Sequence, residues 1–112
     1  MKLYANLDEE NAVSGNGVIG YPLFTLENTC VEGLETGVGV YTAENYPEPA
    51  VHADNEGFFV SHGQGFAKVG DTELSLTPGT TFVAPAGVSH AIKKDRTGGE
   101  LRIFQFHWPA AC

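Results

Sequence analysis

Two histidines and one glutamate are the residues of this sequence whose types could act together in chemistry. His52 and Glu56 lie four residues apart in the polar segment HADNE, and His90 lies further along the chain. Divalent metals of intermediate hardness prefer imidazole nitrogen and carboxylate oxygen as ligands. A set of two histidines and one carboxylate also leaves coordination positions free for water, substrate or O₂. The three side chains could therefore hold a metal ion, provided that the fold brings them together.

His90 ends the stretch PGTTFVAPAGVSH, in which two turns enclose a short strand. Pro78 and Gly79 predict the first turn, and Pro85 and Gly87 predict the second. Because proline fixes φ and glycine tolerates positive φ, both corners are well defined. We therefore expect the imidazole to occupy a fixed position at the start of the next strand.

Turn-forming residues divide the whole chain into short segments of strand character. The 14 glycines and 6 prolines recur at intervals of roughly 8 to 12 positions, which is typical of sandwiches and barrels. No segment of helical length between them carries an amphipathic apolar stripe. The sequence therefore predicts an all-β fold, in a single domain over residues 1–112. The predicted strands lie in GVIGYPLFT, GLETGVGVYTA, GFFVSHG, GFAKVG, TELSLT, TTFVAP, VSHAIKK and LRIFQFHW.

Two short connections and the start of the chain carry further expectations. VGDT and DRTGGE are typical of tight hairpin turns, so we expect the strands on either side of each to pair antiparallel. Residues 1–17 include a polar, glycine-bearing segment, DEENAVSGNG. We expect this part of the chain to be loosely held or to cross to a partner subunit.

The segment that contains these residues resembles the cupin family, the superfamily of RmlC-like barrels. GTTFVAPAGVSH matches the second cupin motif, Gly-x5-Pro-x-Gly-x2-His, at every fixed position. The first motif, Gly-x5-His-x-His-x3-4-Glu-x6-Gly, is matched at His52, Glu56 and Gly63. The resemblance spans residues 50–90 and implies a small antiparallel barrel of jelly-roll type that binds one metal ion.

Three positions depart from the family pattern. Glu44 stands where the first motif begins with glycine, Ala50 replaces its first histidine, and Lys94 replaces the asparagine that often closes the second motif. Both histidines of the first motif usually bind the metal, so the resemblance implies a site with one ligand fewer. The remaining ligands are His52, Glu56 and His90. Iron(II) or manganese would suit an enzyme, whereas nickel or zinc could occupy the recombinant protein, because affinity for such sites rises along the series.

His62 and Asp54 lie close to the first motif. His62 shares strand parity with Glu56 and would replace the missing ligand if no β-bulge intervened, but Gly63 and Gly65 favour a bulge. Asp54 is expected to act as a turn residue.

The last predicted strand, LRIFQFHW, has two faces of different character. Phe104, Phe106 and Trp108 make the more apolar face, which we expect to point into the barrel. His107 would then point outward, in a subunit interface. The residues expected to line an apolar pocket beside the metal are Phe58, Phe82, Phe104 and Phe106.

Composition limits the partners of the protein. The 14 acidic and 6 basic residues give a net charge of -8, which repels phosphate backbones and anionic membranes, so we expect no nucleic-acid partner. The start MKLYANLDEENAV has no apolar run of signal-peptide length, and no segment is apolar enough to span a bilayer. Cys30 and Cys112 are too few for a disulfide framework. We therefore expect a cytoplasmic protein without a membrane partner, and its partly hydrophobic open strands favour a homodimer.

The resemblance and the expected pocket predict an enzyme that acts on a small oxygen-bearing organic metabolite. Dioxygenase chemistry is favoured over isomerase, decarboxylase or lyase chemistry. The alternative is a non-catalytic module that binds or senses a small molecule. The metal content of the purified protein would separate the two.

Overall fold

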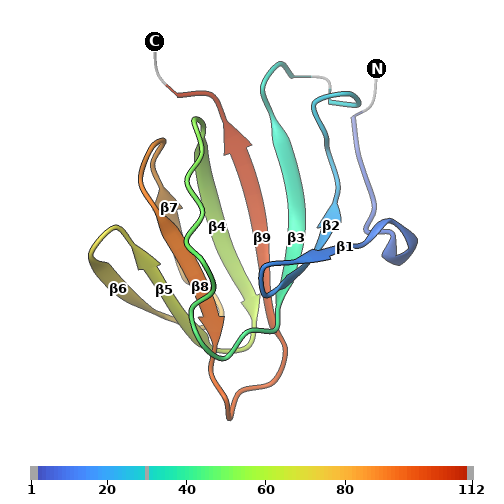
Figure 1. Ribbon diagram of the computed structural model, residues 1–112. Coiled ribbons are helices and arrows are strands. Elements are labelled where there is room, and N and C mark those ends of the chain that lie inside the picture. The colour runs from blue at the N-terminus through green and yellow to red at the C-terminus, as the bar shows by residue number, and fades with distance from the viewer. Residues whose placement is uncertain (1–2, 30, 111–112) are drawn as a thin grey trace.

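The chain folds into two antiparallel β-sheets that share one hydrophobic core (Figure 1). The computed structural model describes residues 3–29 and 31–110. Among these residues the sole helical element is a three-residue 3₁₀ turn, and none of them belongs to a helix long and apolar enough to cross a membrane. The elements are η1 (Glu9–Asn11), β1 (Val13–Gly15), β2 (Val18–Pro22), β3 (Glu35–Tyr41), β4 (Asn55–His62), β5 (Gly65–Val69), β6 (Thr72–Leu76), β7 (Thr81–Ala84), β8 (His90–Lys94) and β9 (Leu101–Trp108). The predicted all-β class is confirmed.

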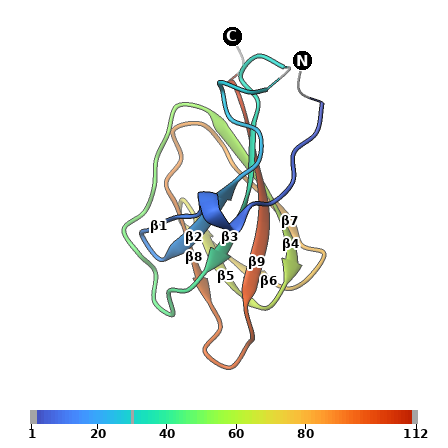
Figure 2. The same ribbon diagram turned by 90° about the vertical axis from the view of Figure 1, so that its right-hand side faces the viewer.

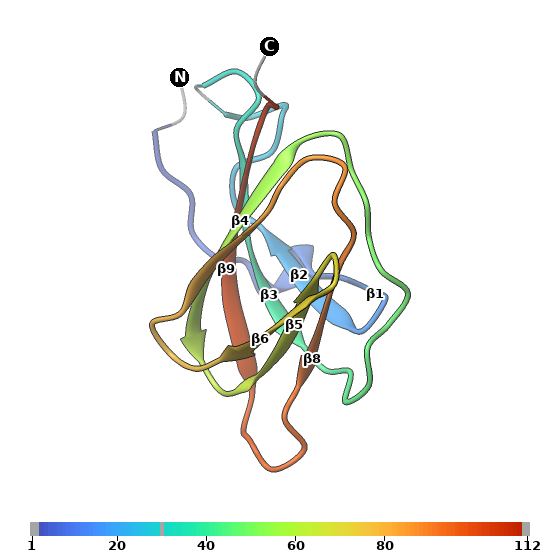
Figure 3. The same ribbon diagram turned by 90° about the vertical axis from the view of Figure 1, so that its left-hand side faces the viewer.

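The two sheets differ in size. The larger sheet has the order β1-β2-β3-β9-β4-β7, and the smaller sheet has the order β6-β5-β8. Figure 3 shows the smaller sheet in front of the larger one, and Figure 2 shows the larger sheet from the side of β1, with η1 beside it. The two sheets form the walls of a barrel, and side chains from both sheets fill its interior.

The connection between β8 and β9 crosses from one sheet to the other. β8 pairs with β5, whereas β9 pairs with β3 and β4. Antiparallel pairing across DRTGGE, which the sequence predicts, is therefore wrong, because a turn signal fixes a reversal of direction and not the sheet that the next strand joins. VGDT does connect a hairpin, formed by β5 and β6.

The core lies between the inner faces of the two sheets. Phe58 is 1% exposed, and its ring stacks on that of Phe82 with a centroid separation of 4.3 Å. Leu101 and Ile103 in β9 are fully buried beside them. The remaining buried members of the core are Tyr41, Val60, Ala67, Leu76, Ala84 and Ile92.

The two turns predicted around TTFVA form as expected. The N–H of Thr80 donates to the carbonyl of Thr77, and the N–H of Val88 donates to that of Pro85, each at 3.0 Å. Gly79 (φ +93°) and Gly87 (φ +78°) occupy the third position of these turns. A positive φ at that position is the type II geometry that favours glycine. These two corners deliver the chain to His90.

Gly63→Ala is expected to destabilise the protein more than Gly79→Ala does. Both residues have positive φ, +83° and +93°, so both substitutions carry the cost of left-handed backbone. A Cβ at Gly63 would also clash with the carbonyl oxygen of Glu100, whereas a Cβ at Gly79 meets no atom within 4 Å. Urea denaturation should show an extra loss of about 1–3 kcal/mol in the free energy of unfolding for Gly63→Ala. Equal losses for the two variants would contradict the clash.

Part of the segment expected to be loosely held forms the edge of the larger sheet. β1 pairs with β2 through a tight turn at Asn16 (φ +52°) and Gly17 (φ +79°). Two central residues with positive φ are typical of a type I′ hairpin. All three residues of β1 are exposed, so the strand extends the sheet without adding to the core.

Candidate metal centre

The side chains singled out in the sequence meet at one end of the barrel. Glu56 is the second residue of β4, His90 is the first residue of β8, and His52 lies in the loop that precedes β4. Glu56 and His90 are buried, with 6% and 8% of their surface exposed. The structure thus brings together the three residues that the sequence predicts as ligands.

Backbone hydrogen bonds hold the loop of His52 against the strand of His90. The N–H of Ala50 donates to the carbonyl of His90 at 2.8 Å, and the N–H of His90 donates to that of Ala50 at 2.9 Å. The N–H of Gly87 donates to the carbonyl of His52 at 2.9 Å. The turn that positions His90 therefore also positions His52.

The donor atoms have the spacing of ligands around one ion. Nε2 of His52 lies 2.9 Å from Oε1 of Glu56, and Nε2 of His90 lies 3.2 Å from the same oxygen. The three residues can each offer one donor atom within 4.8 Å of the other two. Ligands bound at right angles at about 2.1 Å from an ion are about 3 Å apart. The three side chains therefore fit a single divalent metal.

Acceptors behind the imidazoles orient their Nε2 atoms toward Glu56. Nδ1 of His52 lies 2.6 Å from Oδ1 of Asp54, and Nδ1 of His90 lies 3.4 Å from the carbonyl oxygen of Val88. A proton on Nδ1 leaves the lone pair on Nε2 free to bind metal, as is usual for histidine ligands. Asp54, expected to be a turn residue, thus also orients a ligand.

Asp54→Asn is expected to weaken metal binding about 10- to 100-fold, the usual range for loss of an outer partner of a ligand. The substitution keeps the shape of the side chain but removes the charge that holds Nδ1 of His52. Asp71→Asn, in an exposed turn of the smaller sheet, is the matched control. Titration calorimetry with zinc on both variants gives the comparison, and equal affinities would mean that Asp54 does not orient the site.

The carboxylate of Glu56 is held in its ionised form. Burial by itself raises the pKa of Glu56, but hydrogen bonds from His107 and His90 outweigh burial and lower the pKa to about 2. The hydrogen bond between Glu56 and His90 also raises the pKa of His90, against the opposing effect of burial. Protons and a metal ion therefore compete for the imidazole.

His107 faces the site and not the outside of the barrel. It lies directly opposite Glu56 in the ladder between β4 and β9. Its Nε2 lies 3.3 Å from Oε2 of Glu56, and its Nδ1 lies 3.2 Å from Oδ2 of Asp54. The hydrogen bond with Glu56 raises the pKa of His107, while burial acts in the opposite direction. The outward orientation predicted for His107 is therefore wrong.

The aromatic residues of β9 lie on the outer face of the larger sheet. Rings of Phe104 and Phe106 stack with centroids 5.9 Å apart, and those of Phe106 and Trp108 with centroids 5.6 Å apart. Phe106 covers Gly57 on β4, where a Cβ would clash with the ring. The prediction that Phe104 and Phe106 line a pocket beside the metal is therefore wrong, because alternation along β9 directs Gln105 and His107 inward.

His62 lies outside the site. The ladder between β4 and β9 shifts register between Val60 and His62, which confirms the predicted bulge. His62 is exposed, and its Nδ1 contacts Oγ of Ser61 at 2.9 Å. His62 therefore does not replace the ligand that is missing at position 50.

A cavity of about 240 Å³ opens beside the three residues. Its lining includes Phe58, as the sequence predicts, whereas Phe82 lies in the core. Ala50 also contributes to the wall. The position at which the family motif has its first histidine is thus part of the cavity wall.

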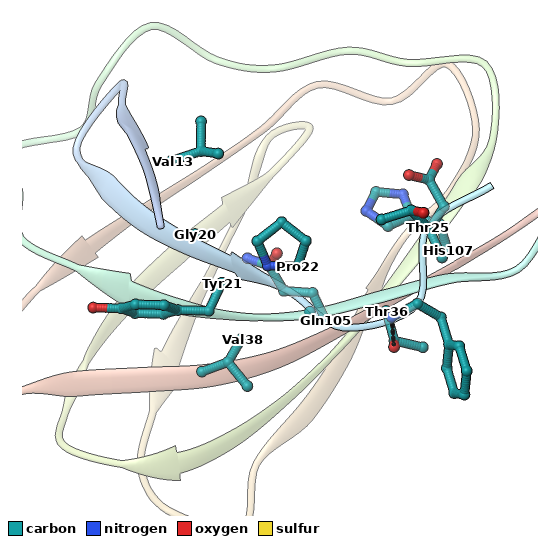
Figure 4. Close-up of a pocket in the computed structure, with 12 residues that line it drawn as sticks. Val13, Gly20, Tyr21, Pro22, Thr25, Thr36, Val38, Gln105 and His107 are labelled. Carbon is teal, nitrogen blue, oxygen red and sulfur yellow. Dashed lines mark hydrogen bonds between the residues drawn. The ribbon is translucent and has the colours of Figure 1, made fainter. Parts of the chain in front are cut away.

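A second pocket, also of about 240 Å³, shares Gln105 and His107 with the first. Figure 4 shows this pocket with His107 at one end and Val13 at the other. His107 therefore stands between two hollows of the inner face.

Comparison with protein families settles the relationship. The family described as "Cupin domain" matches residues 38–106. The chain belongs to the cupin family. The match includes His52, Glu56 and His90 and ends one residue before His107. No curated protein sequence matches this cupin significantly.

Solved structures show the same fold at low sequence identity. The plu4264 protein of Photorhabdus luminescens is 16% identical, with a TM-score of 0.78 over 96% of this cupin and 88% of that chain. A cupin 2 conserved barrel domain protein of Salinispora arenicola CNS-205 is also 16% identical, with a TM-score of 0.76 over 98% and 90% of the two chains. FeII HppE is 20% identical, with a TM-score of 0.73, and this cupin spans 64% of that chain. The jelly-roll barrel predicted from the sequence is confirmed.

Proposed function

We propose that this cupin binds one divalent transition metal through His52, Glu56 and His90 and catalyses a reaction of a small oxygen-bearing organic metabolite. The observation that carries the proposal is the convergence of two Nε2 atoms on one carboxylate oxygen, at ligand spacing and beside a cavity. Iron(II) or manganese is the working metal proposed, and nickel or zinc could occupy the same donors.

The residues around the cavity suit a small organic molecule. Val18, Phe58 and Ile92 contribute apolar side chains to the cavity wall. The side-chain amide of Gln105 donates to the hydroxyl of Tyr41. Burial and the charge of Glu56 raise the pKa of Tyr41 well above its ordinary value, so this hydroxyl remains protonated and can donate to a bound oxygen atom.

The proposed reaction is a dioxygenase reaction, ahead of isomerisation, decarboxylation or elimination. A bound iron or manganese ion would supply Lewis-acid and redox chemistry. Three protein ligands leave up to three positions for substrate and O₂. FeII HppE, one of the fold neighbours, is a protein described with iron(II), and other neighbours are described as DMSP lyases. The fold thus occurs in a protein described with iron(II) and in proteins described as lyases.

Metal analysis followed by oxygen uptake tests the proposal. Elemental analysis of protein purified without chelator should find one transition metal ion per chain. The iron-loaded protein should consume O₂ with at least one member of a panel of diketones, phenols and thiols. Absence of metal would overturn the proposal in favour of a non-catalytic binding module. A stoichiometric metal without O₂ consumption would redirect it to isomerase or lyase chemistry.

The homodimeric state and the cytoplasmic location stay predictions. Sedimentation equilibrium of the purified chain would test the first. A mass equal to that of one chain at micromolar concentration would contradict the homodimer.

A further inference from the structure

We propose that His107 is a fourth protein ligand of the same ion and replaces the histidine that position 50 lacks. The inference rests on the proposed metal site and assigns to it a residue outside both cupin motifs. It is carried by three features of His107: its distance from Glu56, the orientation of its ring, and its position relative to Ala50.

The distance of His107 from Glu56 matches those of the other two histidines. Its Nε2 lies 3.3 Å from Oε2, while Nε2 of His52 and His90 lie 2.9 and 3.2 Å from Oε1. The carboxylate therefore has one imidazole nitrogen at Oε2 and two at Oε1. Neighbouring ligands of one ion are about 3 Å apart when each metal–ligand bond is about 2.1 Å. All three imidazoles are thus at ligand spacing from the same acid.

The ring of His107 has the orientation of a metal ligand. Its Nε2 points to Glu56 and its Nδ1 to Oδ2 of Asp54, at 3.2 Å. His52 has the same arrangement, with Nδ1 2.6 Å from the other oxygen of Asp54. The Nδ1 atom of His107 is buried and lacks the alignment of a hydrogen bond, so its contact with Asp54 is electrostatic. Asp54 thus lies beside the Nδ1 atoms of two imidazoles whose Nε2 atoms face the two oxygens of Glu56.

The position of His107 explains how the site can lose a ligand at position 50. Ala50 pairs with His90 through two backbone hydrogen bonds and lines the cavity. His107 lies on β9 in the larger sheet, directly opposite Glu56 on β4. A fourth ligand on β9 in place of the loop keeps the donor count and leaves a small side chain at position 50 in the cavity wall.

A separate ion between His52, Asp54 and His107 is the competing arrangement, because these three residues can also offer donors within 4.8 Å of one another. Such an ion would bind Nδ1 of His52 and displace the proton that Nδ1 shares with Asp54 at 2.6 Å. It would then leave His52 without the outer partner that directs Nε2 to Glu56. A single ion at Glu56 would leave the contact between Nδ1 of His52 and Asp54 in place.

Cobalt(II) is the probe, because its visible spectrum reports coordination and its binding can be titrated without any substrate. Wild-type protein should bind one Co(II) per chain. His107→Gln should lower the affinity at least about 10-fold and change the intensity and position of the visible bands. His62→Gln, which removes an exposed histidine outside the site, is the matched control and should leave both unchanged.

His107→Cys supplies a second, positive test that does not depend on loss of binding. A thiolate bound to Co(II) gives a charge-transfer band in the near ultraviolet, and this band should appear at one equivalent of Co(II). Circular dichroism of each metal-free variant establishes that it is folded.

The outcomes distinguish the two proposals. Unchanged affinity and spectrum in His107→Gln, with no thiolate band in His107→Cys, would overturn the role of His107 and leave the three-ligand site intact. A stoichiometry that falls from two to one in His107→Gln would overturn the inference in favour of a separate ion at Asp54. Failure of wild-type protein to bind Co(II) would overturn the proposed function and this inference with it.

Discussion

Glu56→Gln is expected to abolish metal binding at micromolar concentrations, with a loss of affinity of at least about 100-fold. The carboxylate lies within 3.3 Å of imidazole nitrogens from His52, His90 and His107, and it is the one anionic donor at the centre of the site. Loss of an outer partner costs about 10- to 100-fold, and loss of the central anionic ligand should exceed that. Titration calorimetry with manganese or zinc measures the change. Affinity within a few-fold of wild type would show that the ion binds elsewhere.

In metal-free Glu56→Gln protein, we expect the pKa of His90 to fall. The pKa of His90 is raised mainly by its hydrogen bond with Glu56, while burial lowers it. Without the carboxylate, burial remains, so the pKa of His90 should fall. Histidine ring signals followed by NMR between pH 5 and 9 would measure this fall, and His62→Gln serves to assign the exposed histidine. An unchanged pKa would contradict the contact between His90 and Glu56.

Acid stability of the metal-free protein should change in the same variant. The pKa of Glu56 is about 2 in the folded chain and 4.5 ordinarily. A lowered pKa adds stability above pH 4.5, and this stability is lost as the pH falls toward 2. Wild-type protein should therefore lose more of its free energy of unfolding between pH 5 and 2 than Glu56→Gln does. Urea denaturation at each pH gives the two curves.

Phe58→Ala is expected to lower the free energy of unfolding by about 3–5 kcal/mol. The side chain is 1% exposed, stacks on Phe82 at 4.3 Å, and lies below the site with its ring 5.9 Å from that of His90. Its removal deletes buried apolar surface and leaves a void between the two sheets. Because cavity formation adds to the loss of transfer energy, the effect should be among the largest in the chain.

Phe59→Ala is the matched control for Phe58→Ala. Phe59 is the next residue along β4, points to the outer face, and is 45% exposed. Its replacement should change stability by about 1 kcal/mol or less. Thermal and urea unfolding of the two variants measure the difference. Similar losses would mean that the two faces of β4 are not assigned correctly.

The sequence was sufficient to predict the site residues whose positions are determined by turns. Gly79 and Gly87 occupy turn positions that need a positive φ, and the intervals around them place His90 at the start of β8. The family motifs then identify His52 and Glu56. The structure brings these residues together because each position depends on local backbone geometry or on fixed spacing.

The orientation of β9 could not be predicted because both of its faces carry apolar residues. Phe104, Phe106 and Trp108 suggested the inner face, but Leu101 and Ile103 are the residues with no exposed surface. Arg102 shares the aromatic face, and burial of an unpaired charge is costly, so Arg102 was the signal that this face is the outer one. A shift of one residue in strand parity reverses every side chain, and His107 was therefore placed outside.

The wrong prediction that the strands on either side of DRTGGE pair with each other has a related cause. Local sequence predicts that the chain reverses direction, and it does, but long-range packing decides that β8 joins β5 and that β9 joins β3 and β4. The pairing of Glu56 with His107 follows from that choice. It is a tertiary property and has no local signature.

The ring of Phe106 covers Gly57 on the outer face of the larger sheet, directly next to the pair of Glu56 and His107. Gly57 and Phe106 are cross-strand partners, adjacent to the pair of Glu56 and His107, which face the other way. An aromatic ring packed over a glycine helps to fix the register of the two strands. A Cβ at position 57 would clash with this ring, which would have to move away from β4. Gly57 is buried beneath this ring, so packing on the outer face of β4 restricts the residue next to Glu56.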